Sequence, residues 1–194
     1  MNTLVIFCHP DPASFTSAVR HSVAHSLYSA GHQIRHRDLY ADGFEPVLSA
    51  QERSAHFDDP ATKPEIAEHA DDLRWCESLV LIYPTWWSGQ PAMLKGWIDR
   101  VWIKGVAWDL PPGATRLTPL LRNIRRITVV TTHGSSKLIN ALEGETGKRV
   151  AFRSLRVICH PRCRTRWVAL YNIDRATDQQ RQRFLARASR VVAK

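Results

Sequence analysis

The sequence predicts an α/β protein with a doubly wound, five-stranded parallel sheet of order 2-1-3-4-5 and helices on both faces. Three observations predict this fold. Short apolar runs alternate along the chain with amphipathic helical patterns, which is typical of a parallel sheet with right-handed crossovers. The composition, with 44% hydrophobic and 23% charged residues, is ordinary for a globular protein. The length of 194 residues fits one domain, so we expect residues 1–194 to form a single domain.

The first strand is predicted over residues 3–8, a short apolar run that the prolines at 10 and 12 end. The next segment predicts an amphipathic helix, because apolar residues recur every four positions. These residues are Phe15, Val19, Val23 and Leu27. Gly31 is a typical helix stop. Residues 32–38 are more polar and predict a weaker strand near a sheet edge.

The middle of the chain predicts a loop, two helices and a second strong strand. Residues 39–63 are polar and predict a long loop with at most one helical turn. A helix is predicted over 64–76 and a buried strand over 78–83, which Pro84 ends. Pro91 is placed to begin the next helix, where its missing N–H costs least. The apolar face of that helix is formed by Leu94, Ile98, Val101 and Trp102.

The last part of the chain completes the alternation. Residues 102–115 predict a loop, and 126–132 predict a third strong strand. Residues 136–152 predict a helix that is broken near Gly144 and Gly147, and we expect the last sheet strand over 155–159. A closing helix follows residues 172–178, with one apolar face. That face contains Phe184, Leu185, Ala188, Val191 and Val192.

Charge is unevenly distributed along the chain, whose formal net charge is +9. Residues 1–115 contain 9 basic and 14 acidic residues, whereas residues 116–194 contain 18 basic and 4 acidic residues. The basic part fits either an anionic partner, such as a phosphorylated cofactor or an acidic subunit, or a solvated arginine-rich surface. No pattern resembles a recognition helix, a zinc finger or an aromatic RNA-binding sheet, so nucleic acid is not expected as a partner.

Targeting and metal-binding signals are not found in the sequence. No apolar run is long enough to cross a bilayer and no secretory signal is present, so we expect a cytoplasmic protein without an integral membrane segment. Disulfides are therefore not expected among Cys8, Cys76, Cys159 and Cys163. The cluster at 159–163 (CHPRC) has no second Cys/His pair at usable spacing. We expect no metal site there, but reduced cysteines at a strand end.

A sheet of this order binds ligands at the carboxyl ends of its strands, next to the point where the order reverses. The first loop at these ends leads directly into a helix and lacks the glycine patterns of nicotinamide-binding and P-loop proteins. It offers His9, Ser14, Thr16 and the free N–H groups of a helix N-terminus, which suit a phosphate or pyrophosphate. The alternative is that Ser14 is an ordinary helix cap.

The second and third loops suit a flat ring. Trp86 and Trp87 follow a buried strand, and five of the seven tryptophans lie between positions 86 and 108. Aromatic walls beside a Gly/Pro-shaped loop suit a conjugated ring, although a tryptophan-rich core or a dimer contact would also explain them. Residues 131–136 bring hydroxyl and N–H groups that could support negative charge on a ring edge. The alternative is an ordinary turn capped by Ser135 or Ser136.

These segments resemble the NAD(P)H:quinone oxidoreductases of flavodoxin-like fold, which include the quinone reductases and the bacterial modulator-of-drug-activity proteins. The matching segments occur in the family's order and cover most of residues 3–136. They are His9 with Ser14-Phe15-Thr16, residues 83–101 (YPTWWSGQPAMLKGWIDRV), and Thr131-Thr132-His133-Gly134. The C-terminal third resembles the shorter bacterial members through His160-Pro161, Trp167 and Tyr171.

The resemblance implies a non-covalent flavin, FMN or FAD, that takes a hydride from NADPH or NADH and passes two electrons to a quinone-like acceptor. It places the phosphate side of the flavin at His9, Ser14, Phe15, Thr16 and Ala18. It places the ring along Pro84, Thr85, Trp86, Trp87 and Ser88, and the pyrimidine edge at Thr131, Thr132, His133 and Gly134. A homodimer is also implied, with residues 86–108 and 39–63 as candidate contacts. The basic C-terminal third favours NADPH, whose 2′-phosphate can pair with arginine.

The chain departs from the family's pattern at three points. Thr16 stands where many members have Asn, and His133 stands where the well-studied quinone reductases have Gly. No residue matches the Tyr and His that assist hydride transfer in the animal enzymes, which leaves the source of the proton open. His133, whose imidazole could crowd the ring edge or give it a proton, is the candidate catalytic residue. Two other functions share these loops. One is a regulatory subunit of a potassium efflux system, and the other is a flavodoxin-type electron carrier, which the computed pI near 9.9 disfavours.

Overall fold

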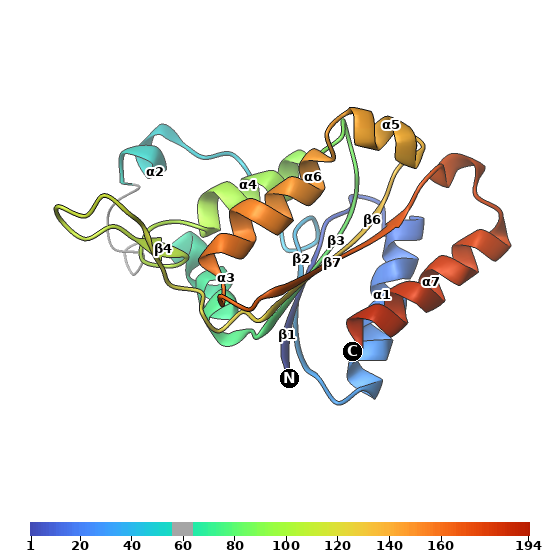
Figure 1. The fold of residues 1–194 in the computed structure, drawn as a ribbon, viewed down its shortest axis with the longest axis horizontal. Helices are drawn as coiled ribbons and strands as arrows, with labels where there is room; N and C mark the ends of the chain where they lie inside the picture. The colour runs from blue at the N-terminus through green and yellow to red at the C-terminus, as the bar shows by residue number, and fades with distance from the viewer. Residues whose placement is uncertain (56–63) are drawn as a thin grey trace.

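The computed structural model describes residues 1–55 and 64–194 and has a parallel five-stranded sheet at its centre (Figure 1). The strand order is β2-β1-β3-β6-β7, which confirms the predicted 2-1-3-4-5 arrangement. All four neighbouring pairs in this sheet are parallel. The strands are β1 (Asn2–Phe7), β2 (Gln33–Asp38), β3 (Ser78–Pro84), β6 (Arg126–Thr132) and β7 (Arg164–Leu170).

Helices cover both faces of the sheet. On one face, α1 (Phe15–Ser29) packs against α7 (Asp178–Val192), as Figure 1 shows. The other face is covered by α3 (Pro64–Trp75), α4 (Ala92–Val101) and α6 (Thr146–Arg149). The short helices α2 (Ala50–Ser54) and α5 (Lys137–Leu142) lie at the periphery. The predicted loop over 39–63 thus holds one helical turn, and its residues 56–63 lie outside the described part of the chain.

The hydrophobic core has two layers because strand side chains alternate between the faces of the sheet. Leu4, Ile6, Leu79 and Leu81 pack on the side of α3 and α4, whereas Val5, Phe7, Val80 and Ile82 pack on the side of α1 and α7. All seven residues of β3 are buried, as expected for a central parallel strand covered on both sides.

The predicted last strand is wrong. Residues 155–159 do not join the sheet, because a π-helical turn (Val150–Leu155) and a 3₁₀ turn (Arg156–Ile158) occupy this region. The fifth strand is β7, whose sequence RTRWVAL contains two arginines. Among the described residues it pairs with β6 alone, so it is an edge strand, where charged side chains can reach water.

Two smaller elements also differ from the sequence prediction. The predicted 102–115 loop contains β4 (Trp108–Asp109), which pairs antiparallel with β5 (Thr118–Pro119). The predicted helix over 136–152 is broken at Gly144, where φ is +89° and an L-residue would be strained. It is not broken at Gly147, which lies inside α6.

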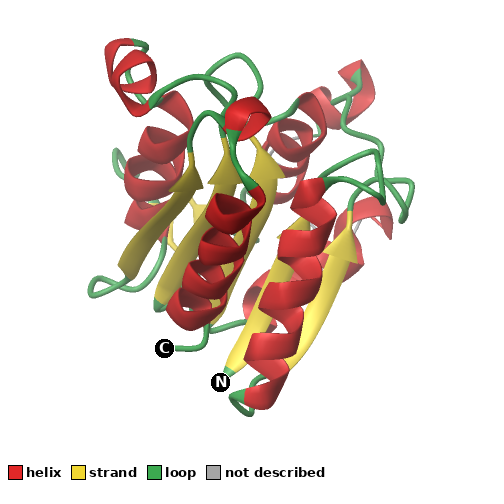
Figure 2. Ribbon diagram, turned by 90° about the vertical axis from the view of Figure 1, so that its right-hand side faces the viewer, coloured by secondary structure: helices red, strands yellow, loops and turns green. Residues whose placement is uncertain are grey.

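All strands of the main sheet end on the same side of the molecule, so the loops that follow them meet there (Figure 2). The four cysteines are buried and free. Burial raises the pKa of the Cys8 thiol, at the end of β1, to about 12. Over residues 1–55 and 64–194, no group of His, Cys, Asp and Glu could hold a metal ion, and no helix is long and apolar enough to cross a membrane.

Candidate functional site

A pocket of about 390 Å³ lies at the carboxyl ends of β1, β3 and β6, and we call it the main pocket. Nine of the predicted site residues line it, from all three predicted loops. They are His9, Ser14, Phe15, Thr16, Pro84, Thr85, Trp86, Thr132 and Gly134. Ile173 and Asp174, from the connection between β7 and α7, complete the lining. Residues of the three predicted loops therefore lie around one pocket.

The first loop presents the N-terminus of α1 to the main pocket. The Ser14 hydroxyl accepts a hydrogen bond from the Ser17 N–H at 3.2 Å, so Ser14 is also a helix cap. The backbone N–H groups of Phe15 and Thr16 have no acceptor among the described residues. The first turn of α1 contains no acidic residue. A helix end with free N–H groups and no acidic residue in its first turn suits an anionic ligand.

The second loop makes a tight turn that exposes both tryptophans. The Trp86 and Gly89 backbones exchange two hydrogen bonds of 3.2 and 3.1 Å, and φ is +47° at Trp87 and +62° at Ser88. This left-handed conformation is unfavourable for residues with a side chain. Trp86 is 41% exposed, with its ring centroid 6.2 Å from that of His9, and Trp87 is fully exposed at 102%. The turn therefore directs aromatic surface into solvent beside the pocket.

Three hydrogen bonds fix this turn to the segment that follows β6. The Ser88 hydroxyl donates to the Glu143 carboxylate at 2.6 Å, and the Thr146 hydroxyl donates to the Ser88 carbonyl. The Gln90 amide donates to the Gly147 carbonyl at 3.2 Å. The turn is therefore held in place by protein contacts.

The backbone of the third loop is partly occupied by bonds within the protein. The His133 N–H donates to the Leu170 carbonyl at 2.8 Å, and the Ile173 N–H donates to the His133 carbonyl at 3.0 Å. The N–H of His133 is therefore not free for a ligand. The N–H of Gly134 has no acceptor within the described ranges. A Cβ atom at Gly134 would lie 3.1 Å from the Asp174 carboxylate, so a larger residue there would require this side chain to shift by a few tenths of an ångström.

The His133 side chain is buried and stacks on the Tyr171 ring, with centroids 4.7 Å apart and an interplanar angle of 19°. Its Nε2 lies 3.5 Å from the Thr85 hydroxyl, which contacts the Thr131 hydroxyl at 3.0 Å. Its Nδ1 is buried and has no hydrogen-bond partner in the described structure. Burial lowers the pKa of His133, so the imidazole is neutral at pH 7.

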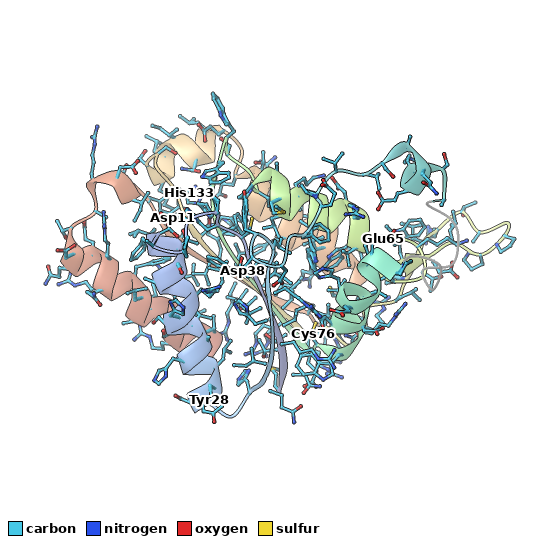
Figure 3. All side chains as sticks on the ribbon, turned by 180° about the vertical axis from the view of Figure 1, so that it is seen from behind. Asp11, Tyr28, Asp38, Glu65, Cys76 and His133 are labelled. Atoms are coloured by element: carbon cyan, nitrogen blue, oxygen red, sulfur yellow. The ribbon has the colours of Figure 1, made fainter. Side chains whose placement is uncertain are left out.

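His133 faces a second, smaller pocket of about 220 Å³, which we call the side pocket. It shares Thr85 and Gly134 with the main pocket, so the two are adjacent. Its lining contains Thr85, Trp87, Ser88, His133, Gly134, Ser135, Asn140 and Glu143. Figure 3 shows His133 and Asp11 at one end of the molecule, with Tyr28 and Cys76 at the other.

The remaining predicted residues do not line either pocket. Ala18 is exposed on α1, and Thr131 is buried beneath Thr85. Five lining residues were not among the predicted site residues, namely Ile173, Asp174, Ser135, Asn140 and Glu143. The first two follow β7, which the sequence prediction misplaced. The absence of a carboxylate over 146–173 makes Asp174 conspicuous in the sequence, and this is the signal that could have pointed to it.

A hollow of about 400 Å³ also lies beside the edge strand β2, but its charged groups bind one another. The Asp72 carboxylate accepts hydrogen bonds from Arg35 at 3.0 Å and from Arg37 at 2.6 Å. Arg37 also pairs with Glu68 at 2.9 Å. Because these charges are already paired, the hollow offers a ligand less than the main pocket does.

A family model described as "Flavodoxin-like fold" matches residues 1–192. The chain belongs to this flavodoxin-like family. Among curated proteins it is 34% identical over 124 residues to an uncharacterized NAD(P)H oxidoreductase of Haemophilus influenzae, a match that covers 63% of this chain and 60% of that protein. The chain therefore matches less than two thirds of that relative's length.

Two solved structures superpose over the whole length of this chain. Smu.1420 from Streptococcus mutans UA159 matches with a TM-score of 0.86 and 28% identity, covering 100% of this chain and 99% of that one. The NAD(P)H:quinone oxidoreductase from Methanothermobacter marburgensis matches with a TM-score of 0.85 and 26% identity, covering 100% and 98%. The chain is thus related to NAD(P)H oxidoreductases of the quinone reductase type.

Proposed function

We propose that this protein is a flavin-dependent NAD(P)H:quinone oxidoreductase that transfers two electrons from a nicotinamide donor to a quinone-like acceptor. The observation that carries the proposal is the pair of adjacent pockets, which lie between a free helix N-terminus and an exposed tryptophan turn. The likeness to the Methanothermobacter marburgensis quinone oxidoreductase supports the reaction class.

The residues present fit a flavin nucleotide. The N–H groups of Phe15 and Thr16 at the α1 N-terminus, with the Ser14 and Thr16 hydroxyls, would bind the phosphate. Trp86 and Trp87 provide apolar surface for the ring system, and the unpaired Gly134 N–H would donate to the polar edge of the ring. When bound, the flavin supplies the hydride chemistry that no amino-acid side chain can perform.

The protein's own contribution is orientation, exclusion of water and proton handling. The bonds from Ser88 and Gln90 to the segment 143–147 hold the tryptophan turn in place. The turn would therefore lose little conformational entropy when the flavin binds. His133 is the proposed catalytic group. It is neutral at pH 7 and close to the Thr85 hydroxyl, so it can accept a proton or pass one through Thr85. The side pocket next to it would admit donor and acceptor in turn.

Further parts of the proposal rest on the family resemblance and on charge. We propose a homodimer of single-domain chains in the cytoplasm, with FMN or FAD as the cofactor. NADPH is the preferred donor, because residues 116–194 provide 18 basic residues against 4 acidic residues. The fully exposed Trp87 is a candidate for contact with a second subunit.

Titration of the purified, flavin-stripped protein with FMN and with FAD tests the binding step, with quenching of flavin fluorescence as the readout. We expect saturable binding of at least one nucleotide. Steady-state oxidation of NADPH and NADH with a soluble quinone then tests the reaction. A protein that binds neither nucleotide would refute the proposal. Flavin binding without turnover would favour the regulatory-subunit alternative.

A further inference from the structure

The amino ends of β6 and β7, opposite the pockets, lie beside a strongly basic surface. Residues 110–142 and 146–173 contain no aspartate or glutamate. Five exposed arginines from these segments form what we call the arginine face: Arg122, Arg125, Arg153, Arg156 and Arg162. Such a concentration of one sign of charge creates a field that attracts anions.

The guanidinium groups of the arginine face are not neutralised by the protein. None of the five forms an ion pair with a carboxylate within residues 1–55 and 64–194. Arg122 and Arg156 instead donate to the backbone carbonyls of Cys159 and Cys163, each at 2.9 Å. These bonds orient the two side chains but leave their charge available.

The pKa of His160 indicates how closely the arginines gather. It is lowered, first by desolvation and then by the positive charges of Arg125, Arg162 and Arg122. Three guanidinium groups therefore act on one imidazole. Arg122, Arg125 and Arg162, which are up to 40 positions apart in the sequence, therefore lie near one another on the surface.

Aliphatic side chains are exposed on the same surface. Leu117, Leu120 and Val157 are 54%, 40% and 67% exposed. They lie on neighbouring segments, because β5 packs against the 3₁₀ turn Arg156–Ile158 and Leu121 bridges to Cys159. Exposed aliphatic groups next to unpaired arginines are typical of proteins that dock on a membrane surface.

We propose that the arginine face docks on the surface of a bilayer that contains anionic phospholipids. The guanidinium groups would bind lipid phosphates, while Val157, Leu117 and Leu120 would enter the boundary between headgroups and acyl chains. A nucleic acid would satisfy the charges but would leave these aliphatic side chains in water, and the face has no exposed aromatic side chain for base stacking. The main pocket, at the other end of the sheet, would stay open to soluble ligands.

Co-sedimentation of the full chain with vesicles tests this proposal. We expect binding to vesicles in which about a third of the lipid is phosphatidylglycerol, weak binding to pure phosphatidylcholine, and loss of binding at high salt. The triple variant R125Q/R153Q/R162Q should bind about a hundredfold more weakly, since each arginine near an anionic surface contributes about fivefold. None of these three side chains forms a hydrogen bond or an ion pair with the described residues, and circular dichroism would verify the fold of the variant.

The matched control is R183Q/R187Q/R190Q, which removes the same charge from exposed positions of α7 on another face. It should retain vesicle binding within about fivefold. V157S should weaken binding without changing net charge, because insertion needs an apolar side chain. Absence of vesicle binding by the wild type, equal loss in both triple variants, or full binding by V157S would each overturn the proposal. Binding to duplex DNA but not to vesicles would assign the face to nucleic acid instead. None of these outcomes depends on flavin binding.

Discussion

Two pairs of tryptophans that lie within 17 residues of one another have opposite environments. Trp97 is fully buried and Trp102 nearly so, and their rings contact each other with centroids 6.4 Å apart. Trp86 and Trp87 are exposed on the turn that follows β3. Trp97 and Trp102, at the end of α4, hold this helix in the core, whereas Trp86 and Trp87 contribute little to the core. Tryptophan content alone therefore does not distinguish core from binding surface, but the position of the residue relative to a strand end does.

The largest expected effect concerns the buried pair. Trp97→Ala removes a side chain that is fully buried and donates from Nε1 to the His69 ring at 3.3 Å. We expect the free energy of unfolding to fall by about 3–5 kcal/mol, because a large cavity forms in the core. Urea denaturation measures this. Trp97→Phe, which retains most of the side-chain volume, should lower the free energy of unfolding by clearly less. An equal decrease in both variants would contradict the explanation by a cavity.

Gly96, in the same helix, should be the next most sensitive position. A Cβ atom there would overlap the backbone of Pro46, so α4 and the 39–63 region approach each other at a point where only glycine fits. Gly96→Ala should lower the free energy of unfolding by about 1–3 kcal/mol despite the higher helix propensity of alanine. The control is Lys95→Ala, which breaks an exposed pair with Asp99 and should cost about 0.5 kcal/mol or less. A stabilising effect of Gly96→Ala would show that the close approach is absent.

The exposed pair should behave in the opposite way. Trp87→Ala should change the free energy of unfolding by less than about 0.5 kcal/mol, since the indole makes no core contact. Flavin affinity should nevertheless fall by about tenfold, because a stacking surface is lost. Fluorescence titration and urea denaturation on the same sample separate the two effects. Unchanged flavin affinity would argue against the aromatic wall, as would a large loss of stability.

Ser88, in the tryptophan turn, has a strained left-handed backbone and a hydrogen bond from its hydroxyl to Glu143. Ser88→Ala loses the hydrogen bond to Glu143 and should lower the free energy of unfolding by about 1 kcal/mol. Ser88→Gly loses the same bond but removes the strain at φ +62°, so it should be about 1 kcal/mol more stable than Ser88→Ala. Thermal denaturation of the two variants measures the difference. The reverse order would mean that the turn is not left-handed at this residue.

The smallest effect is a pH dependence at His133. Burial lowers its pKa in the folded state, so the unfolded state takes up a proton first as the pH falls. Stability should be unaffected above the ordinary histidine range near about 6.5 and should decrease as the pH falls through it. His133→Gln should show a shallower decrease. Because His36 and His69 also have lowered pKa values in both proteins, only the difference between the two curves reports on His133.

The fold was predictable because its central strands are simple. The runs that became β1, β3 and β6 are rich in apolar and β-branched residues and are buried at nearly every position, since helices cover both faces of the sheet there. The edge strand β7 was missed because its partly exposed positions hold Arg164 and Arg166, which made the segment look polar. The more apolar segment 155–159, just before it, was predicted as the strand instead. Periodicity alone cannot identify a strand whose faces are only partly covered.

The site was predictable to the extent that it depends on strand ends. Thr85 and Gly134 reach the pockets because they follow β3 and β6 directly. Two aspects could not be predicted, because they depend on contacts between distant segments. The His133 N–H is occupied by the Leu170 carbonyl, and Asp174 reaches the pocket through the connection after β7. Both depend on where the fifth strand lies.

The burial of the cysteines bears on the proposed reaction with quinones. Quinones are electrophiles that form covalent adducts with thiolates, and the thiolate is the reactive form of cysteine. Cys8 immediately precedes the first site loop, and its pKa of about 12 keeps it protonated at physiological pH. A protein of this design can therefore hold an alkylating substrate close to a cysteine without being inactivated by it.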